Sequence, residues 1–470
     1  MASLKKSTLR PRKNSNLVAT INSPLKTQLA SYLTSNLAPI LRPGLKLLLA
    51  FSGGLDSRVL LELLAALRSG KNFNLSAMHV HHGLSPNANA WARFCSDTCA
   101  ALHVPIEIVR VNVAKDSGLG LEAAARNARY QALLNTDADY VALAHHQDDQ
   151  AETLLLQLLR GAGAKGLSGM ALRDKERRLL RPLLDISRAE LLAFAKQHDL
   201  QWITDESNDD ISYDRNYCRH EVFPIIEKRF PAAKQTLARS ASHLAEAAML
   251  LDELARLDIG QVDAAQIDSV QLQKQLDLAV LASLSEPRAR NLLRWWLSAN
   301  SQSLPSTIRL QEMLRQLLTA KADARVKIAI NSAEGVYLRR YQGFAYLESN
   351  SHSLPIALLW QGEAELRLPD NSRLVFEKKL GCGLAFKRLG INKLRIAHRT
   401  GGERFKPDLA KPTRTLKHLL QEADMPPWQR ERLPLVYCDD VLAVVPGIGV
   451  ACTMQARADE TGLTILWQQV

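Results

Sequence analysis

The chain has 470 residues, of which 46% are hydrophobic and 23% are charged. These fractions are typical of a soluble globular protein of about two to four domains. No apolar run approaches the ~20 residues that a membrane span needs, which excludes a membrane-spanning helix. The formal net charge of +12 favours a polyanionic partner such as nucleic acid, with a generally basic surface as the alternative.

The N-terminal segment is basic, and from Met1 to Leu55 the chain contains neither Asp nor Glu. We predict a disordered basic tail to about Asn16, followed by a helix that ends near Leu37. A basic start that contains serine is also typical of an organellar transit peptide. The six cysteines form no CxxC pair and no zinc-type spacing with histidine, so we expect free thiols and a cytoplasmic protein.

An apolar run, Leu45–Phe51, leads into a glycine-containing turn. The run predicts a buried parallel strand, and the leucine spacing after the turn predicts a helix. A strand, turn and helix in this order aim backbone N–H groups and a helix N-terminus at one point, where an anion binds. We predict that a nucleotide is bound by Ser52, Gly53, Gly54, Leu55, Asp56 and Ser57.

Asp56 is the unusual member of this turn, because a carboxylate repels phosphate unless a cation lies between them. We therefore predict that Asp56 holds Mg²⁺. The turn is not a Walker A loop, since no Gly-Lys-Ser/Thr follows at the required spacing. An ordinary strand-to-helix turn is the alternative, because Gly-Gly alone is common.

Strand and helix patterns alternate along the next part of the chain. The predicted strands cover 75–84, 105–111 and 140–144, and the predicted helices cover 57–67, 87–102 and 121–134. This alternation indicates repeated βαβ units and a doubly wound parallel sheet. Because the polar clusters Ser52–Ser57, His79–Gly83 and His145–Asp149 each follow a strand, we expect all three at one mouth of the sheet.

The helix predicted after residue 144 starts with polar side chains on one face. His145, Asp149 and Glu152 follow the spacing i, i+4 and i+7. Two carboxylates and an imidazole at a helix start suit metal binding or the capture of an ammonium group. The alternative is the usual enrichment of acidic residues in a first helical turn, which we accept for Asp148.

Cations mark two other features of this region. Arg126 offers a planar guanidinium that can clamp a phosphate, with a surface pair to Glu122 as the alternative. The glycine-rich stretch 159–170 predicts a mobile loop. Its Arg160 and Lys165 favour a lid or a nucleic-acid contact over a passive connector.

The rest of the chain divides into a helical part and a strand-rich part. Periodicity predicts helices almost throughout 231–318, with Trp295 and Trp296 in their core. Short strands at 326–330, 335–340 and 344–348 finish this part, and a serine-rich linker follows at 349–353.

The strand-rich part contains a basic stretch between Gly381 and Arg432. Twelve Lys or Arg and five Asp or Glu give this stretch a net charge of +7. Cations interleaved with Phe405 and Trp428 fit a nucleic-acid face that combines phosphate contacts with stacking, and a solubilising surface is the alternative. Across the chain we predict nucleic-acid contacts for Arg160, Lys165, Arg399, Arg404, Lys406, Lys417 and Arg430.

Together these segments resemble the tRNA(Ile)-lysidine synthetase family of ATP pyrophosphatases, over about Lys46 to Val450. The turn alone is shared with several families, whereas the full set of motifs is specific. The motifs, in chain order, are 52–57, 79–84, Glu122 with Arg126, 144–153, 160–170, 181–184, 205–208, 401–404 and 426–430. The basic N-terminal extension is longer than the family leads us to expect.

The resemblance implies an ATP-dependent ligase that forms a carbon–nitrogen bond. ATP would adenylate the wobble cytidine at carbon 2, in a tRNA(Ile) with a CAU anticodon, and release pyrophosphate. The side-chain amine of free lysine would then attack carbon 2 and displace AMP. Asp56 would hold Mg²⁺, Arg126 and His145 would stabilise the phosphate charge, and Asp149 and Glu152 would hold the lysine ammonium group.

The expected fold class is α/β: a doubly wound parallel sheet of the PP-loop ATPase, adenine nucleotide alpha hydrolase-like kind, a helical domain and a small α+β domain. We assign 1–40 to a basic extension and first helix, 41–228 to the catalytic domain, and 229–350 and 355–470 to tRNA-binding domains. We expect no membrane partner, and a homodimer stays open. Two alternatives are a PP-loop enzyme that thiolates a tRNA base, against which the cysteine spacing argues, and a non-catalytic tRNA-binding protein.

Overall fold

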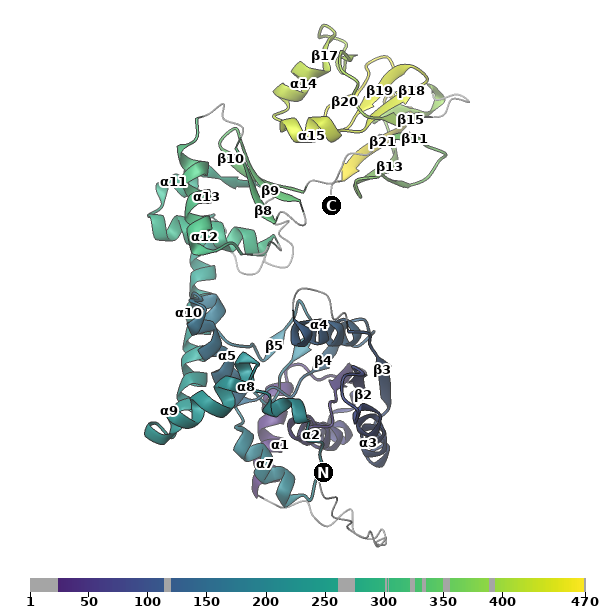
Figure 1. The fold of residues 1–470 in the computed structure, drawn as a ribbon. Coiled ribbons are helices and arrows are strands. Elements are labelled where there is room, and N and C mark those ends of the chain that lie inside the picture. Colours follow the sequence, from purple (N-terminus) through teal and green to yellow (C-terminus); the bar gives the residue numbers. More distant parts are fainter. Residues whose placement is uncertain are drawn as a thin grey trace. The chain divides into compact units, whose positions relative to one another are not determined.

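A computed structural model describes residues 24–113, 120–260, 275–300, 302, 304–321, 326–331, 335–349, 356–388 and 394–468. The predicted N-terminal tail, with its transit-peptide alternative, and the linker residues 350–353 lie outside the described residues. The chain divides into two compact units, Met1–Leu251 and Asp252–Val470 (Figure 1). In the described part of the chain, no helix combines the length and the apolar character needed to cross a membrane.

The first unit is built on a six-stranded sheet with the order β3-β2-β1-β4-β6-β5. Its strands are β1 (Lys46–Ala50), β2 (Asn74–His81), β3 (Ile106–Arg110), β4 (Tyr140–Ala142), β5 (Arg173–Asp174) and β6 (Leu179–Leu180). All neighbours pair in parallel except β5, which runs antiparallel to β6. The predicted doubly wound sheet is confirmed. Because β1 pairs with both β2 and β4, the order of connection reverses there, and ligands of such sheets bind at this point.

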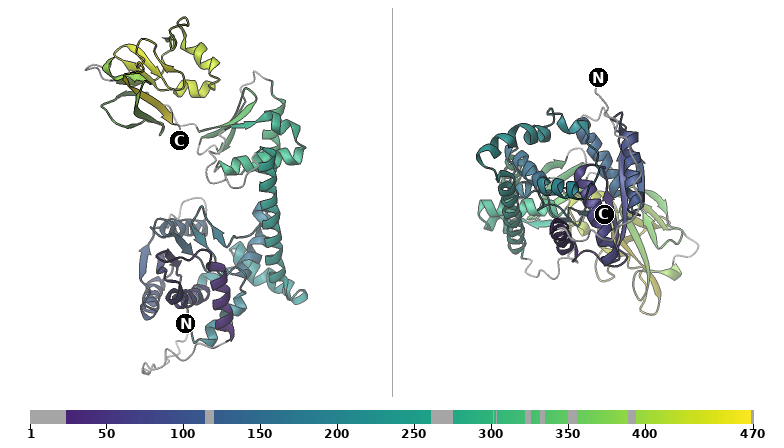
Figure 2. Two further views of the ribbon diagram at one scale, coloured as in Figure 1. Left: turned by 180° about the vertical axis from the view of Figure 1, so that it is seen from behind. Right: turned by 90° about the horizontal axis from the view of Figure 1, so that it is seen from below.

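Helices lie on both faces of this sheet (Figure 1, Figure 2). The helices between residues 24 and 258 are α1 (Pro24–Leu37), α2 (Leu55–Lys71), α3 (Ala88–Ala101), α4 (Leu121–Leu134), α5 (Gln147–Leu159), α6 (Ala164–Leu167), α7 (Arg188–Gln197), α8 (Asp214–Tyr217), α9 (Phe223–Arg229) and α10 (Ala233–Asp258). The helix α4 has the predicted bounds. A 3-10 turn (Glu206–Asp209) and a π-helical turn (Cys218–Val222) lie before and after α8.

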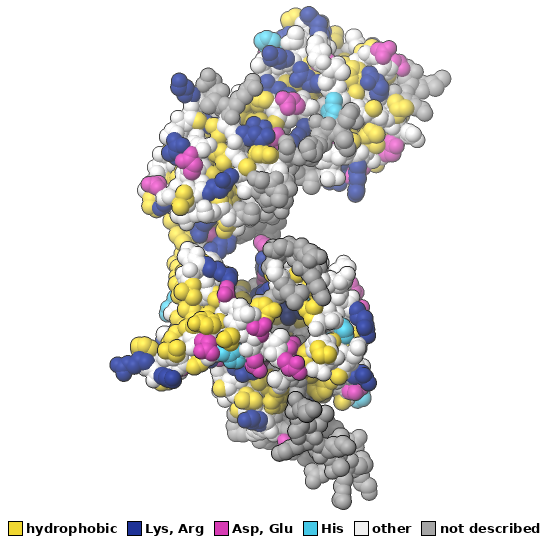
Figure 3. Space-filling model, in the orientation of Figure 1, with side chains coloured by type: hydrophobic (Ala, Val, Ile, Leu, Met, Phe, Trp, Pro, Cys, Tyr) yellow, Lys and Arg dark blue, Asp and Glu magenta, His cyan; other side chains and the backbone are white. Residues whose placement is uncertain are grey.

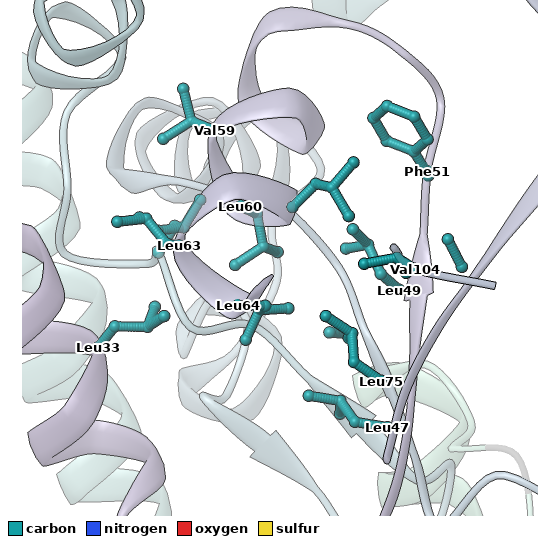
Figure 4. Packing of buried hydrophobic residues seen from close by; sticks show 14 of the residues in the cluster. Leu33, Leu47, Leu49, Phe51, Val59, Leu60, Leu63, Leu64, Leu75 and Val104 are labelled. Atoms are coloured by element: carbon teal, nitrogen blue, oxygen red, sulfur yellow. The ribbon is translucent and has the colours of Figure 1, made fainter. Parts of the chain in front are cut away.

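The core of the first unit explains why the turn after β1 has a rigid base. Alternate residues of β1 point to opposite faces, so Leu47 and Leu49 pack with α2, while Leu48 packs in a second cluster with Leu133 of α4. Figure 4 shows Leu60 and Leu64 of α2 packed beside Leu47 and Leu49. Each fully buried leucine contributes about 1.5–3 kcal/mol, so strand and helix hold the turn between them firmly.

The second unit begins with a helical part packed on an antiparallel sheet. Its helices are α11 (Leu278–Ser283), α12 (Glu286–Ala299) and α13 (Thr307–Thr319), and the sheet order is β7-β10-β9-β8. The strands are β7 (Gln275–Asp277), β8 (Lys327–Asn331), β9 (Val336–Tyr341) and β10 (Phe344–Ser349). Trp296 is buried in this core as predicted. The prediction of helix almost throughout 231–318 is wrong at β7, whose three residues pair with the distant strand β10.

The C-terminal part of this unit is a small α+β domain, as predicted. Two sheets, β11-β15-β18-β19-β20 and β12-β13-β21-β14, share one core. Their strands are β11 (Ala357–Leu359), β12 (Glu365–Arg367), β13 (Arg373–Leu380), β14 (Leu384–Ala385), β15 (Leu394–Ala397), β18 (Leu435–Cys438), β19 (Val441–Val445), β20 (Gly449–Val450) and β21 (Thr461–Gln468). The remaining elements are a 3-10 turn (Phe386–Arg388), the hairpin β16 (Arg404–Phe405) and β17 (Arg414–Thr415), and the helices α14 (Leu416–Glu422) and α15 (Pro427–Arg432).

Candidate active site

The turn after β1 is shaped for a phosphate group. No side chain caps the N-terminus of α2, whose N-cap residue is Gly54, so the first N–H groups of the helix stay available to a ligand. The hydroxyl oxygens of Ser52 and Ser57 lie 3.0 Å apart, and the Ser57 hydroxyl donates to the Gly54 carbonyl. The predicted nucleotide-binding residues thus form one compact turn at the carboxyl end of β1.

Gly53 is required here for two reasons. Its φ is +83°, a conformation that favours glycine. A Cβ at this position would overlap the Cδ1 atom of Ile203 and lie 2.9 Å from the Sγ atom of Cys95. Ile203 also donates its N–H to the Gly53 carbonyl at 2.9 Å, so a residue far along the chain holds the turn in place.

Asp56 lies in the first turn of α2 and faces a buried histidine, His146. The Asp56 Oδ2 atom is 3.6 Å from the His146 Nε2 atom, while the Asp56 Oδ1 atom is buried without a hydrogen-bond partner among the described residues. Burial raises the pKa of the Asp56 carboxyl; His146 opposes this effect and the Asp149 carboxylate adds to it. The loops after β1 and β4 therefore meet at Asp56.

The environment of Asp56 fits the predicted Mg²⁺. An orphaned, desolvated carboxylate oxygen gains most from a cation, and Mg²⁺ is usually held by one or two carboxylates together with substrate phosphates. In the described part of the chain no group of three His, Cys, Asp or Glu could hold a metal ion by itself. The residues present thus suit a metal that arrives with a nucleotide.

Asp149 and Glu152 bind two arginines that our interpretation of the sequence did not select, Arg215 and Arg219. Glu152 is fully buried, and its oxygens accept hydrogen bonds from the Nε atoms of both arginines at 2.7 Å. The Asp149 Oδ1 atom accepts from Arg215 at 3.0 Å, and its Oδ2 atom accepts from the His146 N–H at 2.9 Å. All four carboxylate oxygens are therefore occupied by the protein.

This network occupies Glu152, for which the spacing i, i+4, i+7 predicts a place at the mouth and a role toward the lysine ammonium group. Its side chain is fully buried and binds the guanidinium groups of Arg215 and Arg219, so that it positions both arginines. The role of Glu152 toward lysine stays a prediction. Asp148 is structural, as we interpreted it, because it accepts from the Arg188 N–H and pairs with Lys234.

His145 lies before α5 rather than on it, because the helix begins at Gln147 with His146 as its N-cap residue. The His145 Nδ1 atom is buried without a partner in the part of the chain that the structure describes. Burial lowers the pKa of His145 to about 3, so the imidazole is neutral at physiological pH. His145 can donate a hydrogen bond to a phosphate but brings no positive charge. Arg126, on α4, is exposed and contacts Tyr130; the side chain of Glu122 lies outside the described residues.

Comparisons with known proteins agree with this geometry. The PP-loop domain family matches residues 23–226, the TilS substrate binding domain matches residues 276–346, and the TilS substrate C-terminal domain matches residues 394–467. A tRNA(Ile)-lysidine synthase of Nitrosomonas europaea is 44% identical over 440 residues, which cover 92% of this chain and 94% of that protein. The chain belongs to the tRNA(Ile)-lysidine synthase family.

A second relative and one solved structure are also similar to this chain. A tRNA(Ile)-lysidine synthase of Azoarcus sp. is 41% identical over 438 residues, which cover 92% of this chain and 93% of that protein. Among solved structures, the U34-tRNA thiolase NcsA from Methanococcus maripaludis, with its 4Fe-4S cluster, aligns with 47% of this chain and 79% of that chain. The TM-score of this alignment is 0.40 and the sequence identity is 20%.

The glycine-rich stretch is less free than the predicted mobile loop. It contains α6, and beyond this helix the Met170 N–H donates to the Gln150 side chain at 2.7 Å while Gln150 donates back to the Met170 carbonyl. Arg160 and Lys165 are exposed, and Arg160 pairs with Asp214 at 3.4 Å. Backbone anchoring of this kind was not visible in the glycine content.

The predicted nucleic-acid residues of the C-terminal domain differ in exposure. Arg404 and Lys417 are exposed, Lys406 is half-buried, and Arg399 lies 3.6 Å from Glu403. Lys and Arg side chains are spread over the visible face of this domain (Figure 3). The prediction that Phe405 stacks on a base is wrong, because Phe405 is buried in the core beneath α14.

Arg430 and Trp428 are engaged within the second unit. The Arg430 Nη2 atom donates to the Tyr341 hydroxyl at 2.7 Å, and its Nε atom donates to the Met425 carbonyl. The Trp428 ring packs edge-on against Tyr341 and Tyr346 of the neighbouring sheet. These two side chains join α15 to β9 and β10, so in this structure they do not present a free face for stacking.

The missed residues share one property. His146, Arg215 and Arg219 form the buried half of the site, yet each looks ordinary in the sequence. In the sequence, the segment containing Arg215 and Arg219 shows only a cluster of charged residues. The feature that could have identified it is the spacing of four residues between the arginines. Two arginines at this spacing lie on one helical face and can bind two carboxylates of another helix.

Proposed function

We infer that this chain carries out the ATP-dependent ligation of lysine to the wobble cytidine of tRNA(Ile) with a CAU anticodon. The reaction forms a carbon–nitrogen bond at carbon 2 of the base through an adenylated cytidine, and it releases AMP and pyrophosphate. One observation carries this conclusion: the nucleotide turn, Asp56, His146 and Asp149 meet at one mouth, in a chain whose other segments match the substrate domains of the family.

The nucleotide half of the reaction uses the turn and its neighbours. Backbone N–H groups of α2 and the hydroxyls of Ser52 and Ser57 would bind the pyrophosphate portion of ATP. Mg²⁺ would be held by Asp56 and would neutralise charge on the leaving pyrophosphate. Arg126 and the neutral imidazole of His145 would contact the transferred phosphate, the first by charge and the second by hydrogen-bond donation.

The lysine half depends on Asp149. We propose that the ammonium group of free lysine binds beside this carboxylate and loses a proton before it attacks carbon 2. Since Arg215 already binds Asp149, the ammonium group would share the carboxylate with that guanidinium or displace it. Glu152 would keep hold of Arg215 and Arg219 throughout.

The remaining partners follow from the surface. We propose that the exposed cations Arg160, Lys165, Arg404 and Lys417, together with Lys406, contact the tRNA backbone, and that the enzyme works in the cytoplasm. The target base must leave its stack to reach the mouth, which costs little in a single-stranded anticodon loop. Light scattering on the purified chain distinguishes a monomer from the homodimer considered above.

One assay tests the function directly. The full chain is incubated with ATP, Mg²⁺, isotopically labelled lysine and a tRNA(Ile) transcript with a CAU anticodon, and the nucleosides are analysed by mass. We expect labelled lysidine at the wobble position and AMP release that depends on lysine. A thiolated base, or AMP release without lysine, would identify the thiolating alternative, and no turnover at all would leave only tRNA binding.

A further inference from the structure

We propose that His79 is a positioning residue for the nucleotide turn. It holds the peptide between Phe51 and Ser52 in the direction that binds the phosphates of ATP, and Cys95 supports the turn beside it. This role rests on the proposed function, since it explains how the same turn keeps its shape. The proposed reaction gives His79 no other part, although the sequence places it in one of the three polar clusters that follow a strand.

His79 lies on β2 at a position where packing alone would favour an apolar residue. Leu75 and Ala77 point into the core cluster that contains α2, and the alternation of a strand places His79 on the same face. The side chain of His79 is 6% exposed. Because a buried imidazole costs free energy unless its polar atoms are hydrogen-bonded, its presence in this core calls for a specific partner.

The partner of His79 is the last carbonyl before the turn. The His79 Nδ1 atom lies 3.0 Å from the Phe51 carbonyl oxygen, and because a carbonyl only accepts hydrogen bonds, Nδ1 is the donor. Burial lowers the pKa of His79, so the imidazole is neutral at pH 7 and carries its proton on this nitrogen. The register of β1 with β2 ends at Ala50 and Met78, so this bond anchors the chain where the strand ladder stops.

The anchored carbonyl sets the direction of a donor on the other side of the same peptide. The carbonyl of Phe51 and the N–H of Ser52 belong to one planar unit, so a bond that fixes the first also fixes the second. Ser52 is the first residue of the nucleotide turn, and its hydroxyl oxygen lies 3.0 Å from that of Ser57. His79 therefore acts on the ligand through the backbone.

Cys95, on α3, packs against both His79 and the turn. Its Sγ atom lies 3.4 Å from the His79 Nδ1 atom, and a Cβ added to Gly53 would lie 2.9 Å from the same sulfur. Cys95 is fully buried, so a larger side chain at this position would press on the turn. Cys99, one helical turn further along α3, is equally buried in the same cluster and provides a matched position.

The first experiment changes the donor at position 79 and measures the affinity for ATP with Mg²⁺ by equilibrium dialysis, without tRNA. His79→Leu removes the donor, and we expect it to weaken ATP binding about tenfold. His79→Asn places an amide nitrogen close to the position of Nδ1 and should recover most of the affinity. His79→Gln places that nitrogen near the position of Nε2 and should bind ATP as weakly as His79→Leu.

Steady-state kinetics separate positioning from a general loss of structure. The turn would hold the phosphates in the ground state and in the transition state alike, so His79→Leu should raise the KM for ATP about tenfold and change kcat by less than about threefold. The affinity for tRNA in filter binding should not change. His243→Leu, which removes an exposed imidazole of α10, is the control and should match wild type in the ATP measurements.

A second experiment adds the same bulk at two neighbouring positions of α3. Cys95→Leu and Cys99→Leu both overpack the core and should lower the midpoint of urea unfolding. Cys95→Leu should also weaken ATP binding several-fold, because position 95 lies against Gly53, whereas Cys99→Leu should keep the wild-type affinity. Cys95→Val and Cys99→Val repeat the comparison with a smaller addition if either leucine variant does not fold.

Three results would overturn the proposal. They are ATP binding by His79→Leu within about twofold of wild type, equal ATP affinities of His79→Asn and His79→Gln, and an equal loss of ATP affinity in the two α3 variants, which would assign the effect to core packing. The proposed function fails separately, because a wild-type chain that binds no ATP or forms no lysidine would contradict it whatever the variants do.

Discussion

One oxygen of the Asp56 carboxylate lies 3.6 Å from the buried His146. The other oxygen is buried without a hydrogen-bond partner among the described residues and suits a metal ion. Asp56→Ala should therefore lower ATP consumption by at least about a hundredfold, because charge on the leaving pyrophosphate is no longer offset. Binding of tRNA should stay within about twofold of wild type. Asp97→Ala, which removes an exposed carboxylate of α3, is the control and should retain activity. Full turnover by Asp56→Ala would refute the metal role.

A side chain at position 53 would destabilise the fold in two ways, through the left-handed backbone conformation and through a steric overlap. Gly53→Ala should lower the free energy of unfolding by about 1–2 kcal/mol for the left-handed conformation and by about 1–3 kcal/mol more for the overlap with Ile203. Gly44 has a φ of +80°, and a Cβ added there would meet no described atom within 4 Å, so Gly44→Ala should show only the first cost. Urea unfolding measures both variants, and equal losses would show that the contact with Ile203 is not limiting.

At the scale of elements, α5 is joined to α8 and to the π-helical turn after it by a network of opposite charges. Burial opposes ionisation of Asp149, but His146 and Arg215 outweigh it and bring the pKa of Asp149 to about 2. In an unfolded chain the pKa of Asp is about 3.9. Because the folded value is lower, the contribution to stability is complete above pH ~4 and is lost as the pH falls toward 2.

The variant Asp149→Asn makes this pH dependence measurable. It should be less stable than wild type at pH 7, and the difference should shrink as the pH falls from about 4 toward 2. Asp214→Asn removes an exposed pair with Arg160 and should change stability by at most about 1 kcal/mol at any of these pH values. A difference for Asp149→Asn that does not vary with pH would show that the carboxylate acts through packing.

For the whole molecule, we expect the first unit to carry out catalysis and the second unit to bind the tRNA. Reversing two charges of the C-terminal domain, with Arg404→Glu and Lys406→Glu together, should weaken tRNA binding and reduce the salt dependence. The affinity for ATP should not change, because the nucleotide turn belongs to the other unit. Lys379→Glu, in the exposed part of β13, is the matched control. Unchanged tRNA binding by the double variant would remove this domain from the interface.

Much of the architecture could be predicted because it depends on patterns among residues that are close together in the sequence. The parallel sheet follows from apolar runs separated by helical periods, and the nucleotide turn follows from Ser52–Ser57 at the end of such a run. The strand β7 was missed because three residues carry no period, and its partner β10 lies far along the chain. The glycine-rich stretch was predicted to be mobile because composition does not reveal that Gln150 anchors it.

The sequence by itself determined the order of elements, the nucleotide turn and the family, because each depends on residues that are neighbours in the chain. Only the tertiary structure decided what the charged residues do. Glu152 pairs with Arg215 and Arg219, which lie 63 and 67 residues away, and a carboxylate looks the same in a sequence whether it meets a ligand or a guanidinium. Only the folded structure fixes the distance and burial that set the strength of each charge.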